Sequence, residues 1–155
     1  MAATALGVFR SDDLGRTFVQ VSNGVAGAAV AGLAFLPGDD QLLFATTPMG
    51  LLRSTDTGQT WARHGAGLPF SDITGLAFAD DRRTVFASDF QQGRIYGSTD
   101  GGQTWSPLPS EGLGGGRVWA LAQGRDRRLL AATAGGGLWQ WRPGEAASGE
   151  GTESR

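Results

Sequence analysis

One eight-residue motif occurs three times, and its even spacing constrains the fold more than any other feature of the chain. The copies are residues 11–18 (SDDLGRTF), 54–61 (STDTGQTW) and 98–105 (STDGGQTW), so their first residues lie 43 and then 44 positions apart. A period of roughly 40–45 residues is the size of one four-stranded blade of a β-propeller. We therefore predict an all-β protein made of such blades, and we call each copy of the motif a box.

Short apolar segments recur around each box and predict four antiparallel strands per blade, A to D, with the box between strands C and D. Strand A is predicted at 30–35 (VAGLAF), 73–78 (ITGLAF) and 118–123 (VWALAQ), and strand B at 42–46, 85–88 and 129–133. Strand C is predicted just before each box and again at 137–141. These runs are too short for helices and lack a 3.6-residue period.

The number of predicted strands corresponds to about three and a quarter blades in residues 1–142. Complete propellers typically have about 4–8 blades, so we expect an incomplete or oligomer-completed propeller. The chain would then be half of a symmetric dimer, an open arc, or a piece of a longer protein. Residues 143–155 (PGEAASGEGTESR) are polar and rich in Gly, Ser and Glu, which predicts a disordered tail.

Composition excludes several classes of function. The chain of 155 residues has no Cys, which excludes disulfides, thiolate zinc sites and a Cys nucleophile. Its formal charge of −2 does not favour nucleic-acid binding. No apolar run approaches the length of a membrane span. The first residues are not typical of a signal peptide, so as written we expect a cytoplasmic protein.

The residue types of the box are those that close and anchor a tight turn. The Asp side chain accepts hydrogen bonds from backbone N–H groups, and Gly allows a positive φ. Ser and Thr add hydrogen bonds from their hydroxyl groups. The final aromatic residue is buried between blades, which stabilises the fold by about 2 kcal/mol. The predicted structural residues are Ser11, Asp13, Gly15, Thr17, Phe18, Ser54, Asp56, Gly58, Thr60, Trp61, Ser98, Asp100, Gly102, Thr104 and Trp105. One carboxylate per box is a poor calcium site, and we expect neither metal nor cofactor.

The boxes resemble the Asp-box, or BNR repeat, of sialidase-like β-propellers. They are also similar to those of xyloglucanase-type glycoside hydrolases, the sortilin luminal domain, and the photosystem II assembly propellers with their bacterial relatives. The resemblance covers residues 7–141 and implies that the boxes lie away from the functional face; such relatives are often exported. It does not imply sialidase activity, because the chain has one Tyr, Tyr96, and three of its four Glu lie in the tail.

Candidate site residues are those that break the repeat on one rim, where the B–C and D–A loops meet. At these positions the chain has a charged or aromatic side chain, whereas the aligned position of another repeat has a small or chemically different residue. Ordinary sequence variation in loops is the alternative explanation for such differences. The candidates are Asp72, Asp89, Phe90, Arg117 and Trp119. Asp72 and Asp89 are the carboxylate pair that glycoside hydrolysis would need. The single His, His64, is expected at the surface or partly packed.

Three hypotheses follow from these residues. The first is a non-enzymatic scaffold or protein-binding module, because the boxes are explained by turn chemistry. The alternative is a glycan-binding protein or glycoside hydrolase, sialidase-like or xyloglucanase-like, or a fragment of one. The third is a structural fragment that needs another copy. The expected partners are accordingly a protein or a second copy of the chain, with a glycan as the alternative.

Overall fold

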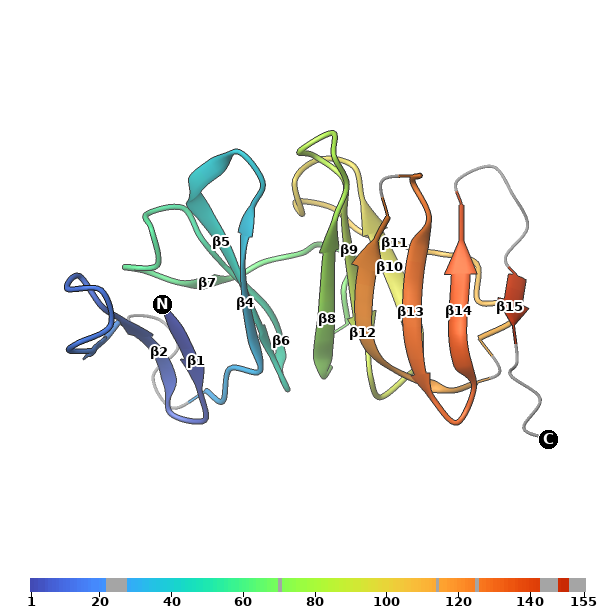
Figure 1. The fold of residues 1–155 in the computed structure, drawn as a ribbon, viewed down its shortest axis with the longest axis horizontal. Coiled ribbons are helices and arrows are strands. Elements are labelled where there is room, and N and C mark those ends of the chain that lie inside the picture. Colours follow the sequence, from blue (N-terminus) through green and yellow to red (C-terminus); the bar gives the residue numbers. More distant parts are fainter. Residues whose placement is uncertain (22–27, 70, 114, 125, 143–147, 151–155) are drawn as a thin grey trace.

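The computed structural model describes residues 1–155 except 22–27, 70, 114, 125, 143–147 and 151–155. Within the described residues all regular structure is β-strand, which confirms the all-β prediction. The strands form four antiparallel sheets that stand side by side (Figure 1). In each sheet, strands that follow one another in sequence are neighbours, which is the meander predicted for a blade.

The first two sheets cover the N-terminal half of the chain. The first contains β1 (Ala2–Thr4), β2 (Gly7–Arg10) and β3 (Val19–Gln20). The second contains β4 (Gly32–Leu36), β5 (Asp39–Thr47), β6 (Gly50–Ser54) and β7 (Ala62–Arg63). The register of β5 and β6 pairs Ala45 with Leu52, which leaves both side chains on the buried face. Among the described residues, the first sheet has three strands, and none of them corresponds to β4.

The third and fourth sheets repeat the pattern. The third contains β8 (Ile73–Phe78), β9 (Val85–Asp89), β10 (Arg94–Ser98) and β11 (Ser106–Pro107). The fourth contains β12 (Arg117–Gln123), β13 (Leu129–Ala134), β14 (Gly137–Trp141) and β15 (Ser148–Glu150). The predicted strands A, B and C of each repeat thus fall on observed strands, because each apolar run is bounded by turn residues.

The last sheet differs from the sequence-based expectation. We expected it to end after the strand at 137–141, yet Ser148–Glu150, within the range expected to be a tail, pairs with β14 as β15. The physical reason is that the outer edge of β14 carries backbone N–H and C=O groups that an extended segment satisfies. The rest of that range, 143–147 and 151–155, lies outside the described residues.

The hydrophobic core lies between the sheets. One cluster joins the first and second sheets, one the second and third, and one the third and fourth. Trp105, at the end of the third box, is buried against Phe44 and Leu51 of the second sheet. Trp61 occupies the same place in the preceding contact. Stability therefore depends on the contact of one blade with the next, as in other repeat folds.

Two different rims follow from this stacking. The B–C turns and the starts of β4, β8 and β12 lie along one edge of the row of sheets, and the A–B turns lie along the other (Figure 1). The boxes belong to the second edge. The amide of Thr57 donates to the Gln41 carbonyl at 3.1 Å, and that of Gly101 donates to the Arg83 carbonyl at 2.9 Å. The box turns and the candidate site residues are therefore on opposite rims.

Candidate functional site

The three boxes form nearly identical turns in which one Asp accepts most of the hydrogen bonds. In the second box, Asp56 Oδ1 accepts the backbone amides of Gln59 and Thr60, both at 2.9 Å, and Oδ2 accepts the Thr60 hydroxyl at 2.6 Å. Ser54 Oγ donates to the same carboxylate at 2.7 Å and accepts the amide of Gly58 at 2.8 Å. Asp13 and Asp100 make the corresponding bonds.

These bonds favour the charged carboxylate and so change its titration. Donation from the Thr hydroxyl, followed by the Thr amide and the Ser hydroxyl, lowers the pKa of Asp13 and of Asp56 from 3.8 to about 2. The same donors hold the pKa of Asp100 well below its ordinary value. Because every bond joins residues of the same turn, the depressed pKa is explained by the structure of the turn.

The box turn places two successive residues at positive φ, and the sequence predicted only the second of them. Gly15, Gly58 and Gly102 have φ between 79° and 87°. The residue before each also has positive φ, 61° at Leu14, 60° at Thr57 and 74° at Gly101. A residue with a Cβ is strained at positive φ. Gly101 is the one of these three residues whose type indicates a positive φ at the first of the two positions.

On the opposite rim, three of the five predicted site residues meet in what we call the rim cluster: Phe90, Arg117 and Trp119. The ring centroids of Phe90 and Trp119 lie 4.4 Å apart at an interplanar angle of 55°. The guanidinium carbon of Arg117 lies 5.2 Å from the Phe90 ring centroid, a cation–π distance. Trp119 is nevertheless 57% exposed. The cluster thus presents one large aromatic surface and one cation to solvent.

A β-bulge explains why Trp119 points to this rim. In the pairing of β12 with β13, Val118 is opposite Thr133 and Ala120 is opposite Ala132, so Trp119 is the extra residue. A bulge turns the side chain away from the alternation of the strand. The third sheet has the same irregularity at Thr74, whose hydroxyl donates to the Val118 carbonyl at 2.9 Å. The bulge thus recurs, with Thr74 as the extra residue in the third sheet and the aromatic Trp119 in the fourth.

The two predicted carboxylates have different surroundings. Asp89 is fully buried. Its carboxylate accepts the Ser71 hydroxyl at 2.6 Å and the amides of Gln91 and Gln92 at 2.9 and 3.1 Å. These bonds shape the turn that carries Phe90, which gives Asp89 a structural role. Asp72 is partly buried, and its backbone carbonyl accepts the Phe90 amide at 2.8 Å.

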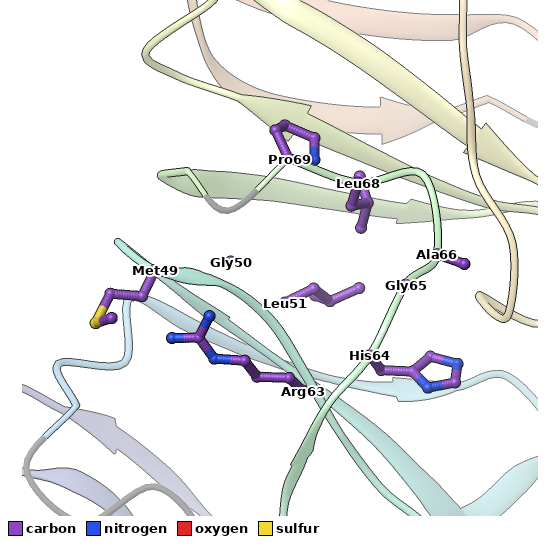
Figure 2. Close-up of a pocket in the computed structure, with 9 residues that line it drawn as sticks. All are labelled: Met49, Gly50, Leu51, Arg63, His64, Gly65, Ala66, Leu68 and Pro69. Carbon is purple, nitrogen blue, oxygen red and sulfur yellow. The ribbon is translucent and has the colours of Figure 1, made fainter.

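A pocket that the sequence did not indicate lies between the second sheet and the loop that leads from it to the third sheet (Figure 2). Its volume is about 270 Å³, and no carboxylate is among its described lining residues. Arg63 and His64 extend in opposite directions from the strand end (Figure 2). Burial lowers the pKa of His64. The lining residues are Met49, Gly50, Leu51, Arg63, His64, Gly65, Ala66, Leu68 and Pro69.

The described residues show neither a cluster of metal ligands nor a helix that could span a membrane. No group of three or more His, Cys, Asp or Glu side chains is placed to hold a metal ion in that part of the chain. Nor does any helix there have the length and apolarity needed to cross a membrane.

The comparisons with known proteins identify the fold. No family model and no curated protein matches the chain. Among solved structures it is similar to an ancestral GH74 enzyme, with a TM-score of 0.76 and 18% identity over 90% of this chain and 20% of the enzyme. YCF48 bound to D1 peptide matches with a TM-score of 0.63 and 20% identity, over 79% of this chain and 40% of YCF48.

A third similar structure is the extracellular domain of BT4673 from B. thetaiotaomicron, with a TM-score of 0.75 and 15% identity over 95% of this chain and 19% of that one. The chain therefore spans less than half the length of each of these structures. Together with the four stacked sheets, the matches show that the chain has the fold of β-propeller blades, arranged as an incomplete propeller.

Proposed function

We propose that this chain is a non-enzymatic propeller module that binds a protein segment through the rim cluster. The exposed contact of Trp119 with Phe90, together with Arg117, is the observation that carries the proposal. Trp and Arg are the residue types enriched in the energetic centres of protein interfaces. A large exposed aromatic surface is unfavourable in water unless a partner covers it.

The chemistry of the carboxylates supports a binding role over a catalytic one. A glycosidase needs two carboxyl groups that reach the substrate from opposite sides of the scissile bond. Asp89 is buried, and three donors occupy its oxygens. It therefore positions the turn that carries Phe90.

The similar structures support the proposal at the level of fold. YCF48, which has this fold, was solved with a bound peptide. We also propose that the three boxes are true Asp-boxes, since each makes the same set of bonds around its Asp.

Glycan binding is the second candidate function, and one observation favours it. An exposed Trp ring offers a flat apolar face of the kind on which a sugar ring stacks, and Trp119 is such a ring. GH74 enzymes are among the proteins of similar fold. A binding experiment that offers both ligand classes separates the two candidates.

We expect the chain to bind members of an array of 15-residue peptides and to lose that binding when the rim cluster is altered. Trp119→Ala and Arg117→Ala should each weaken binding of the strongest peptide by roughly thirtyfold or more, since truncating a central interface residue typically costs at least about 2 kcal/mol. Isothermal titration calorimetry with that peptide measures the change.

The matched control is Met49→Ala, because Met49 is 60% exposed on the same rim but belongs to the second sheet. It should leave the affinity unchanged. A glycan array is run in parallel with the same three variants. Binding to glycans alone, lost in Trp119→Ala, would replace the proposal by the glycan alternative. If neither array shows Trp119-dependent binding, the rim cluster has no such role.

A further inference from the structure

The two outermost sheets of the row each expose a face that is buried at every internal contact. Leu138 on β14 is 53% exposed. The residues at the same repeat position, Val8, Leu51 and Ile95, are 0%, 3% and 1% exposed because the next sheet covers them. The surrounding face is apolar, and most of it is exposed. We call this the trailing face: Ala120, Ala122, Leu130, Ala132 and Leu138.

The first sheet shows the opposite half of the same contact. Phe18, at the end of the first box, is 50% exposed, whereas Trp61 and Trp105 at the same position are 4% and 5% exposed. A Cβ added at Gly102 would touch the Phe44 ring of the preceding sheet, but at Gly15 it would meet nothing within 4 Å. We call the surface formed by Phe9 and Phe18 the leading face.

The internal contacts show how such faces fit together. In the cluster between the second and third sheets, Leu51 of the trailing side packs with Tyr96 and Trp105 of the leading side. At the same repeat positions, the last sheet has Leu138 and the first sheet has Phe9 and Phe18. The two outer faces therefore carry the same kinds of side chain as the halves of a contact that already exists inside the molecule.

The two faces cannot meet within one chain, because they lie at opposite ends of the row (Figure 1). We propose that the trailing face of one chain packs on the leading face of a second copy, with Leu138 inserted against Phe9 and Phe18. The contact joins two different surfaces, so it is heterologous, and repeating it closes a ring or extends an arc. It uses the outer faces of the row and is independent of the rim cluster.

The test uses the 155-residue chain in sedimentation-velocity and sedimentation-equilibrium experiments from micromolar to millimolar concentration. We expect a mass above that of the monomer that increases with concentration. Leu138→Arg and Phe18→Glu each place a charge in the apolar contact and should weaken self-association by about tenfold or more. Met49→Arg introduces the same charge on the rim and should have no effect.

Mixing the two variants gives the most specific result. Each variant alone lacks one half of the contact, but the mixture contains an intact trailing face on Phe18→Glu and an intact leading face on Leu138→Arg. An equimolar mixture should therefore form a dimer that neither variant forms alone. Circular dichroism and thermal unfolding are measured for both variants, which we expect to be folded because the substituted positions are half exposed.

Three outcomes would overturn the proposal. The first is a wild-type chain that stays monomeric at all concentrations. The second is a mixture of the variants that stays monomeric while the wild type associates. The third is association that is lost in Leu138→Arg but unchanged in Phe18→Glu, since that pattern would mean that two trailing faces meet each other.

Discussion

We expect Trp105→Ala to be the most destabilising single substitution at a box, with the free energy of unfolding lowered by about 3–5 kcal/mol. The Trp105 ring is buried between the second and third sheets, and its indole N–H donates to the Gly102 carbonyl at 2.9 Å. Removal of the ring leaves a cavity in that contact and frees a buried carbonyl. In a chain of this size the melting temperature should fall by roughly 10 °C.

Phe18→Ala is the matched control, because Phe18 occupies the same repeat position but is half exposed. It should change the free energy of unfolding by less than about 1 kcal/mol. Both variants are compared with the wild type by urea denaturation at low concentration, where a second copy does not contribute. Equal losses for Trp105→Ala and Phe18→Ala would mean that the contact between neighbouring sheets is not the main source of stability.

The second large expected effect is a loss of folding stability at low pH, caused by the Asp residues of the boxes. A carboxyl group whose pKa is lower in the folded state stabilises the fold at pH values above its ordinary pKa, and the effect is lost as the pH falls through the folded value. For Asp13 and Asp56 these limits are 3.8 and about 2. The contribution of these two carboxylates should therefore be constant above about pH 5 and should decrease between about pH 4 and pH 2.

Asp56→Asn tests this origin, since the amide keeps an acceptor for the turn but cannot titrate in this range. At about pH 3 the unfolded chain binds roughly 0.8 proton more than the folded chain for each such Asp, and the substitution removes that difference at one box. The slope of unfolding free energy against pH is proportional to this difference in bound protons, so it should be smaller for Asp56→Asn in urea titrations between about pH 2.5 and pH 5. Asp12→Asn, next to the first box, is the control. An unchanged slope in Asp56→Asn would exclude the box carboxylates as the cause.

Much of the fold was predictable from sequence because it depends on local patterns. The spacing of the boxes predicted the length of chain in each sheet, and the apolar runs around Leu43, Phe86 and Ala131 predicted their central strands. The bonds around Asp56 followed from the residue types alone, since they join residues at most four positions apart. The strand Ser148–Glu150 was not predicted, because its pairing depends on the free edge of β14 and not on its own composition.

The candidate site was predicted in part. Comparison of the repeats selected Phe90, Arg117 and Trp119 as exceptions, and the structure brings them together. The same comparison selected Asp89 without showing that it would be buried and bonded to Ser71. The pocket beside Arg63 and His64 was missed, since neither residue interrupts a repeat in a way that signals a cavity.

By itself, then, the sequence determined the blade, because turn bonds and strand alternation act between residues that are close along the chain. Tertiary structure decided which equivalent residues are buried and which are exposed. Ile95 and Leu138 have the same place in the repeat, as do Trp105 and Phe18, yet one of each pair is covered and the other is open. The reason is that burial depends on whether a neighbouring sheet stands against that face, which the repeat itself does not encode.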